Sequence, residues 1–296
     1  MEEIAAQTRQ MKTLKRRFKS IFSRIKLRLI GALFKSLYVF GFRGVTPFYF
    51  NNSLALSKML GFTNAKNLFK LERVYHELIV GEKNQAIREK LYIAFNIALD
   101  HFRGAYFQDK LDWGFNKKYI LENKNLFLNK TVLDFGCGYG LSTELLGKFA
   151  KFVYGLDCSQ VCIDNAIERI GHIDNISFQL TNGMRLPYEE ATIDAIYSND
   201  VIEHLHVDDV LFHLKEAHRV LKPDGVYLIF TPDRNKGPHD ITGYFWPMGC
   251  DIPPLGAHIN EFSFEDLSSL LKQAGFSDCI IPEPRIDVLL VAKKTQ

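Results

Sequence analysis

Short β-rich runs alternate with amphipathic helical runs from residue 131 onward, and this alternation restricts the fold more than any other feature of the chain. The pattern predicts strands over 131–135, 152–156, 176–180, 194–198 and 226–231, and helices over 141–149, 160–170 and 207–221. Strands separated by such helices pair in parallel, because the helix is the crossover that returns the chain to the same edge of the sheet. We therefore expect an α/β fold with a mostly parallel sheet.

The segment 232–262 interrupts this alternation with an irregular stretch rich in proline, glycine and aromatic residues. Irregular insertions of this length in a compact domain are usually functional, so we expect this insertion to lie over the active site. A helix over 264–274 with Ser263 as its N-cap, and two strands over 278–281 and 287–292, are predicted to close the domain.

The first 125 residues have a different, helical character. Apolar residues recur at helical spacing over 53–60, 67–80, 84–99 and 117–123. We divide the chain into a basic amphipathic N-terminal helix (1–42), a helical, aromatic-rich extension (43–125) and an α/β domain (126–296). The aromatic residues of the extension form either an ordinary helical core or the lining of a pocket for an apolar substrate.

Positive charge is concentrated at the N-terminus. Residues 1–40 hold ten Lys or Arg and two acidic residues, which leaves 27 basic and 32 acidic residues for the rest of the chain. Over 11–35 the basic residues share a helical pattern with Phe, Ile and Leu. Such a helix lies in an anionic membrane surface, packs on the protein body, or binds nucleic acid. Its apolar content favours lipid over nucleic acid.

Other sequence features favour a cytoplasmic protein. The five cysteines form no CxxC pair and no Cys/His spacing typical of zinc, which indicates a reducing compartment. The longest apolar run, 29–42, is interrupted by Lys35 and is shorter than the roughly 18 residues of a spanning helix. Glu2 and Glu3 do not fit a secretory signal. We expect a cytoplasmic location, with residues 11–35 either associating with a membrane surface or packing on the protein body.

Three alternating glycines, Gly136, Gly138 and Gly140, follow the first predicted strand. Glycines at such a turn let the main chain approach a ligand, and the N–H groups of the following helix point toward it. The spacing is GxGxG rather than the GxGxxG of dinucleotide-binding turns, and Asp134 precedes the first glycine by two positions. A carboxylate there repels a pyrophosphate and attracts a cation such as an α-amino group or a sulfonium.

Polar residues also follow the next predicted strands. Asp157, at the tip of the second strand, is placed to accept hydrogen bonds from two ribose hydroxyls. Asn182 follows the third strand and can bond an adenine edge, and Asn199 stands at the end of the fourth. Together these positions predict a nucleoside-binding crevice at one edge of the sheet.

Five motifs, VLDFGCGYG, VYGLD, NGMRLPY, DAIYSNDVIEHL and RVLKPDGVYLIFTP, resemble those of class I S-adenosylmethionine-dependent methyltransferases in order and spacing. The resemblance covers about residues 129–292. It implies a Rossmann-like, seven-stranded, mostly parallel sheet with helices on both faces, here preceded by an N-terminal helical extension. It also implies that S-adenosyl-L-methionine is the cofactor.

The resemblance assigns cofactor-binding residues by position. Those expected around the methionine part are Asp134, Gly136, Cys137, Gly138 and Gly140, with Asn199 closing over its end; Asp157 would hold the ribose, Cys158 would lie beside the adenine, and Asn182 and Gly183 would face the base. The family commonly has Asp where Asn182 stands. Because an amide carbonyl also accepts a hydrogen bond, we expect weakened rather than lost cofactor binding.

The end of the fourth strand bears on the acceptor. Exocyclic-amine methyltransferases of nucleic acids typically carry Pro-Pro-Tyr after this Asn or Asp, whereas the chain reads Asn199-Asp200-Val201. The motif is more similar to the ubiquinone and menaquinone biosynthesis methyltransferases, many of which methylate oxygen. We therefore expect a small-molecule acceptor, lipid-like, quinone-like or glycan, and no nucleic acid.

Asp200, Glu203 and His204 form a D-x-x-E-H unit. It is similar to the E-x-x-E-H unit that holds a divalent metal in some O-methyltransferases, but Glu-His is also frequent at this strand end, and we expect no metal. His204 and His258 are the predicted catalytic residues, because a histidine titrates near neutral pH and suits a general base.

Two other functions stay open on sequence alone. The basic arm is compatible with an RNA or DNA methyltransferase, although the Pro-Pro-Tyr signature is missing. A non-catalytic module that binds the cofactor and recruits a partner through its helical half is the other alternative, although the motif glycines and acids are retained.

Overall fold

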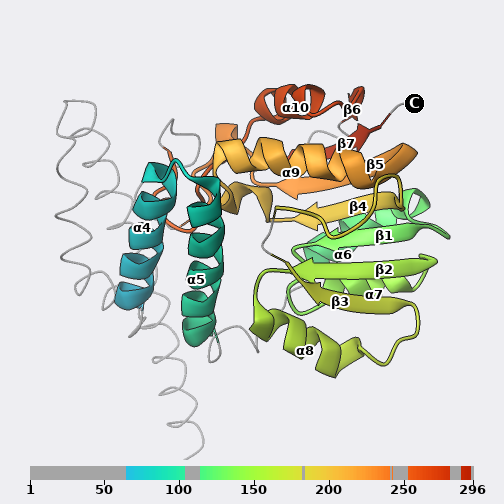
Figure 1. Ribbon diagram of the computed structural model, residues 1–296, viewed down its shortest axis with the longest axis horizontal. Coiled ribbons are helices and arrows are strands. Elements are labelled where there is room, and N and C mark those ends of the chain that lie inside the picture. The colour runs from blue at the N-terminus through green and yellow to red at the C-terminus, as the bar shows by residue number, and fades with distance from the viewer. Residues whose placement is uncertain are drawn as a thin grey trace, which may run out of the picture.

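The computed structural model describes residues 65–103, 114–181, 184–240, 242, 253–280 and 288–294 of the chain. Its centre is a seven-stranded sheet in the order β3-β2-β1-β4-β5-β7-β6 (Figure 1). The strands are β1 (Thr131–Phe135), β2 (Phe152–Asp157), β3 (Ile176–Leu180), β4 (Ile193–Asn199), β5 (Leu221–Thr231), β6 (Asp278–Ile280) and β7 (Val288–Lys293). The helices are α4 (Ala65–Gly81), α5 (Gln85–Arg103), α6 (Gly114–Glu122), α7 (Leu141–Gly147), α8 (Gln160–Ile170), α9 (Val207–Val220) and α10 (Phe264–Gln273).

Strand pairing confirms the expected mostly parallel α/β sheet. β1 pairs in parallel with β2 on one side and with β4 on the other, and β2–β3 and β4–β5 are also parallel. β7 runs antiparallel to both of its neighbours, β5 and β6. Because the chain order reverses between β1 and β4, a crevice is expected at the carboxyl ends of these two strands.

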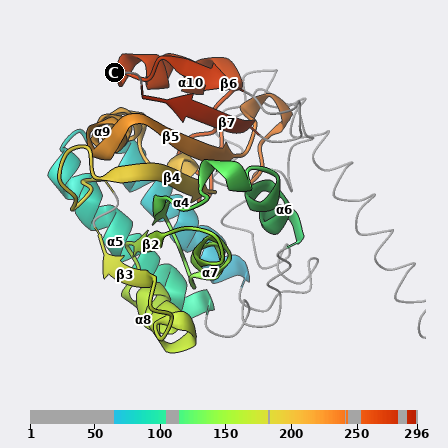
Figure 2. The same ribbon diagram turned by 90° about the vertical axis from the view of Figure 1, so that its right-hand side faces the viewer.

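Two apolar clusters, one on each face of the sheet, form the core. One joins α9 and α10 to side chains such as Leu133 and Ile196, and the other joins α6 and α7 to side chains such as Val132 and Ala195. Figure 2 shows α5 and α9 on one side of the sheet and α6 and α7 on the other. The neighbours Val132 and Leu133 enter opposite clusters, as the alternation of side chains along a strand requires.

The predicted boundary between α9 and β5 is wrong. The expected helix over 207–221 ends one residue earlier, and the strand begins at Leu221 rather than at Val226. Leu221 already pairs with Ile193, and the register shifts before Val226 pairs with Ala195. Pro223 cannot continue a helix, and Asp224 has a positive φ of 63°, so the polar residues 222–225 form an irregularity inside the strand.

The helices before the sheet agree with the sequence pattern where the structure describes them. Those expected over 67–80, 84–99 and 117–123 correspond to α4, α5 and α6. α4 and α5 stand next to each other beyond the carboxyl ends of β2 and β4 (Figure 1). The predicted helix over 53–60 and the basic helix of residues 1–42 lie outside the described residues.

Among the described residues, no helix has both the length and the apolar character that crossing a membrane requires.

Candidate active site

The turn after β1 has the backbone that its glycines predict. Gly136, Gly138 and Gly140 have φ values of 74°, 52° and 73°, a left-handed region that favours glycine. A Cβ at Gly136 would collide with Val201 Cγ2, whereas a Cβ at Gly138 would meet nothing within 4 Å. Gly136 is therefore required by packing, and the space in front of Gly138 is open to a ligand.

Asp134 is buried at the base of this turn. Its carboxylate is 1% exposed and accepts a hydrogen bond from Thr143 Oγ1 at 2.6 Å. Burial raises the pKa of Asp134 to about 6, although the hydroxyl contacts from Thr143 and Ser142 act in the opposite direction. A buried carboxylate that needs a counter-charge fits the α-amino group or sulfonium expected from the sequence.

Asp157 ties the end of β2 to the glycine turn. Its two carboxylate oxygens accept from the main-chain N–H groups of Gly138 and Ser159, each at 2.9 Å. Cys158 is half-buried beside it. Cys137 is buried close to Gly155, and burial raises the pKa of its thiol well above the usual value, which disfavours the nucleophilic thiolate form.

Asn199 ends β4 at the same edge of the sheet. Its amide Nδ2 donates to Asp200 Oδ2 at 2.8 Å, and its buried Oδ1 has no hydrogen-bond partner in the part of the chain that the structure describes. Asp200 turns the chain with a φ of 52°. Asn182 and Gly183 lie outside the described residues.

The two predicted catalytic histidines meet at this edge. The rings of His204 and His258 are 5.1 Å apart between centroids and nearly perpendicular. His204 Nδ1 donates to the carbonyl of Ala257 at 2.9 Å, and His258 Nδ1 lies 2.9 Å from Glu261 Oε1. Because a carbonyl or carboxylate oxygen only accepts, each Nδ1 carries the proton, and Nε2 carries the lone pair of the neutral ring.

Glu203 completes the group. It is fully buried, its Oε2 accepts from Thr231 Oγ1 at 2.9 Å, and its Oε1 has no hydrogen-bond partner among the described residues. Burial and the nearby charge of Asp200 raise the pKa of Glu203 to about 8. One ligand atom each from Glu203, His204 and His258 lies within 4.8 Å of the other two, an arrangement that suits either proton transfer or a divalent cation. Asp200 is not part of this group.

Glu261 orients the insertion around this group. Its carboxylate accepts from the main-chain N–H of His239 at 2.7 Å and contacts the imidazoles of both His258 and His239. Burial alone would raise the pKa of Glu261, but these hydrogen bonds hold it at about 2. Burial also opposes protonation of His258, yet the hydrogen bond to Glu261 and the charge of Glu203 raise its pKa overall.

The structure adds residues that sequence reasoning missed. Thr231 reaches Glu203 from the end of β5, and His76 of α4 contacts the main-chain carbonyl of His258 through Nδ1 at 3.1 Å. The end-of-strand position of Thr231 was a usable signal. His76 had none, because one histidine on an amphipathic helix is indistinguishable from an ordinary surface residue.

Comparisons with known proteins agree on the segment that carries the glycine turn. Residues 133–229 match a family model described as a methyltransferase domain. A probable S-adenosylmethionine-dependent methyltransferase of Mycolicibacterium smegmatis is 35% identical over 147 residues, which cover 50% of this chain and 52% of that protein. The mitochondrial ubiquinone biosynthesis O-methyltransferase of Bos taurus is 31% identical over 49% of this chain and 41% of its own length. The chain thus spans about half or less of these curated relatives.

One solved structure shares the fold over a larger part of the chain. Phosphoethanolamine N-methyltransferase 1 of Haemonchus contortus, in complex with phosphoethanolamine and S-adenosylhomocysteine, superimposes with a TM-score of 0.55 at 20% identity. The match covers 73% of this chain and 51% of the other.

Proposed function

We propose that this chain, which contains a class I S-adenosylmethionine-dependent methyltransferase domain, transfers a methyl group to an oxygen of a small-molecule acceptor. One observation carries the choice of oxygen: His204 and His258 each have Nδ1 bonded to an oxygen, which leaves Nε2 as the accepting nitrogen, and one ring nitrogen of each lies within 4.8 Å of the other and of the buried Glu203 carboxyl group. A hydroxyl must lose its proton as it is methylated, and an imidazole is suited to accept that proton.

The cofactor half of the proposal assigns the donor. S-adenosyl-L-methionine supplies the methyl group on a positively charged sulfur. Asp134 would face the methionine end, Gly136, Cys137, Gly138 and Gly140 would provide the main-chain cradle, and Asn199 would close over it. Three features support these roles: the buried carboxylate of Asp134, the open space at Gly138, and Asn199 Oδ1, which has no hydrogen-bond partner among the residues that the structure describes.

The nucleoside would follow the next two strands. Asp157 would hold the ribose and Cys158 the adenine, with Asn182 and Gly183 at the base. Two main-chain N–H groups already hold the Asp157 carboxylate in position, and its remaining acceptor sites suit ribose hydroxyls.

In the chemical step, one proton moves from the acceptor hydroxyl to the protein. The acceptor oxygen forms a bond to the methyl carbon as the carbon–sulfur bond breaks, and S-adenosylhomocysteine leaves. The hydroxyl proton passes to Nε2 of His204 or His258. Glu261 keeps the proton on Nδ1 of His258, so that Nε2 remains the accepting atom.

The acceptor class is inferred from a relative and from the basic N-terminal residues. The relative from Bos taurus is an O-methyltransferase of ubiquinone biosynthesis, and we propose a quinone-like, lipid-like or glycan hydroxyl for this chain. Residues 11–35 would bring the enzyme to a membrane surface from the cytoplasm, with 43–125 and the insertion 232–262 enclosing the acceptor.

The experiment is transfer of radiolabelled methyl from S-adenosyl-L-methionine to three probes: catechol, phosphoethanolamine and total RNA. We expect label in catechol and a fall in its rate of about 100-fold or more with His204→Ala. His172→Ala is the matched control, because His172 is exposed in the turn between α8 and β3, and it should leave the rate unchanged. Label in phosphoethanolamine or RNA alone, or full activity of His204→Ala at every pH, contradicts the proposal.

The same assay tests the expectation that no metal takes part. A divalent cation held by Glu203, His204 and His258 would replace the imidazole as the group that activates the hydroxyl. If a histidine is the base, EDTA leaves the rate unchanged. Loss of activity with EDTA, restored by magnesium, manganese or zinc, assigns the three residues to a metal instead.

A further inference from the structure

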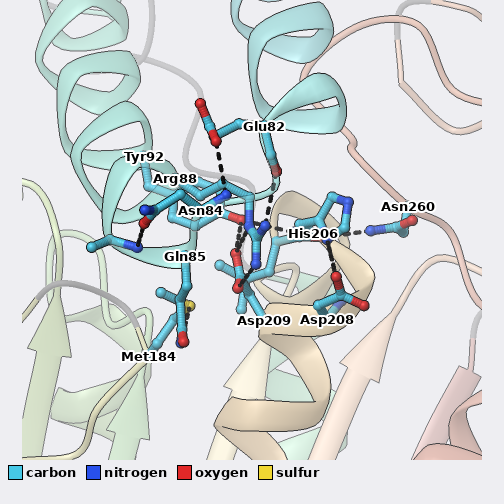
Figure 3. A network of polar contacts seen from close by, with 12 residues as sticks. Glu82, Asn84, Gln85, Arg88, Tyr92, Met184, His206, Asp208, Asp209 and Asn260 are labelled. Carbon is cyan, nitrogen blue, oxygen red and sulfur yellow. Dashed lines mark hydrogen bonds and ion pairs between the residues drawn. The ribbon is translucent and has the colours of Figure 1, made fainter.

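Helix α5 is fastened to α9 by a buried network of charged and polar groups (Figure 3). Arg88 donates from Nε and Nη2 to the two carboxylate oxygens of Asp209, at 2.6 and 2.5 Å. Tyr92, one turn along α5, donates its hydroxyl to Asp209 Oδ2 at 2.6 Å and accepts from the main-chain N–H of His206 at 2.8 Å. All three side chains in this contact are buried.

The network holds the stretch between β4 and α9, which we call the catalytic segment (200–206), because it carries Glu203 and His204. Tyr92 bonds the last residue of this segment directly. From the other side, the main-chain N–H of Ile259 donates to the carbonyl of Glu203 at 2.7 Å. The catalytic segment is therefore held between α5 and the insertion that supplies His258.

The same arginine also fixes the turn between α4 and α5. Its Nη1 donates to the carbonyl of Glu82 at 2.8 Å. α4 in turn carries His76, which contacts the carbonyl of His258. One guanidinium thus sets the position of both helices that stand beyond the carboxyl ends of the strands (Figure 1).

Stability alone does not account for this choice of residues. Taking a guanidinium and a carboxylate out of water is costly, and a well-packed apolar pair usually serves stability at least as well. A planar, two-pronged contact specifies one relative placement of two elements, which an apolar contact does not. Asp209 does not cap its own helix either, since that role belongs to the imidazole of His206.

We infer that Arg88 and Tyr92 are positioning residues: through Asp209 and the main chain of His206 they hold α5 and the catalytic segment in the one arrangement that places His204 opposite His258. The inference rests on the proposed function in that His204 and His258 are taken as the reacting groups. Positions 88 and 92 lie outside residues 133–229, which match the methyltransferase domain model, so this contact joins that segment to the helices that precede it.

The test uses two variants of the full chain and one matched control. Arg88→Met/Asp209→Leu removes both charges together, so that no buried charge is left unpaired. Tyr92→Phe removes only the hydroxyl. Tyr227→Phe is the control, because its buried hydroxyl also makes two hydrogen bonds, to Ser198 Oγ and His213 Nε2, both at 3.0 Å, and neither partner belongs to the catalytic segment.

Three readouts separate positioning from stability. Hydrogen exchange of peptides that contain residues 200–206 should be roughly fivefold faster in Tyr92→Phe than in the wild type, because the bond from His206 N–H is lost. The NMR signals of the His204 imidazole nitrogens should shift in both Tyr92→Phe and Arg88→Met/Asp209→Leu. Turnover of catechol should fall about tenfold while the affinity for S-adenosylhomocysteine stays the same.

The inference is overturned if Tyr92→Phe and Tyr227→Phe give the same exchange pattern, or if exchange increases evenly over the whole sheet. Unchanged His204 signals in Arg88→Met/Asp209→Leu overturn it as well. The exchange and spectroscopic readouts need no acceptor. Failure of the proposed function, seen as no methyl transfer by the wild type, is therefore distinguishable from failure of the positioning role of Arg88 and Tyr92.

Discussion

The three glycines of the turn after β1 look alike in the sequence, but a side chain would have different effects at Gly136 and at Gly138. We predict that Gly136→Ala destabilises the fold by about 2–4 kcal/mol, because positive φ strain adds to the collision with Val201. Gly138→Ala should cost only about 1–2 kcal/mol but weaken S-adenosylhomocysteine binding at least about tenfold, since its methyl group enters the open space that we propose the ligand occupies. Urea unfolding and calorimetric titration measure the two effects, and equal behaviour of the two variants contradicts the assignment.

Asp134 predicts a pH dependence of cofactor binding. In the free protein its pKa is about 6, so the carboxyl group is largely protonated below that pH. A bound α-amino cation favours the ionised form, and binding at low pH must therefore release a proton. Affinity for S-adenosyl-L-methionine should fall about tenfold per pH unit below pH 6 and be constant above pH 7. Asp134→Asn should bind more weakly and show no such slope in titrations from pH 5 to 8.

Glu261 predicts a separate, acid-dependent contribution to stability. Its pKa is lowered to about 2 in the fold from an ordinary 4.5. The ionised group therefore stabilises the fold fully above pH 4.5, and this contribution, about 3 kcal/mol, is lost as the pH falls toward 2. Glu261→Gln should flatten stability against pH over this window, whereas Glu265→Gln, on the neighbouring helix, serves as the control. A variant that keeps the wild-type slope shows that another carboxylate is responsible.

At the scale of elements, the strand and helix pattern was predictable because its causes are local. Periodicity and end signals located β1, β3 and α8 to the residue. The β5 boundary was not predictable, because residues 222–225 join the strand only through the register shift against β4. That Asp134, Asp157 and Asn199 lie at one edge of the sheet was predictable, because each stands at or near the carboxyl end of a parallel strand. The Arg88–Asp209 contact was not predictable, since the two residues are 121 positions apart and each looks like an ordinary surface charge on its helix.

The N-terminus of α10 tests whether the N-cap residue predicted from the sequence, Ser263, stabilises the helix. Ser263 accepts from the main-chain N–H of Asp266, and the Asp266 carboxylate accepts from the N–H of Ser263 in return. Ser263→Ala should reduce the free energy of unfolding by about 1 kcal/mol, because it removes one of these partners. Ser263→Thr retains the hydroxyl, which also donates to Asp266 Oδ2, and should remain close to the wild type in the same denaturation experiment. Equal loss in both variants contradicts a capping role.

At the scale of the whole molecule, the concentration of positive charge at the N-terminus predicts that the chain acts at a membrane surface. If residues 11–35 lie in an anionic membrane surface, deletion of residues 1–42 should abolish co-flotation with phosphatidylserine-containing vesicles. The affinity for S-adenosylhomocysteine should be unchanged, because the proposed cofactor residues all lie beyond residue 133. Wild-type flotation of the deletion variant contradicts the membrane role, and binding of RNA by the same arm at physiological salt supports the nucleic-acid alternative.

The Arg88–Asp209 contact also limits how this protein can change in evolution. Loss of either partner alone leaves a charge buried without its counter-ion, which is strongly destabilising, whereas joint replacement by apolar residues is tolerated. Descendants of one ancestor should therefore keep both residues or exchange both, so that the two positions covary across an interval of 121 residues. Lineages that have lost the pair together are those in which we expect the acceptor to have changed while the methyl donor has not.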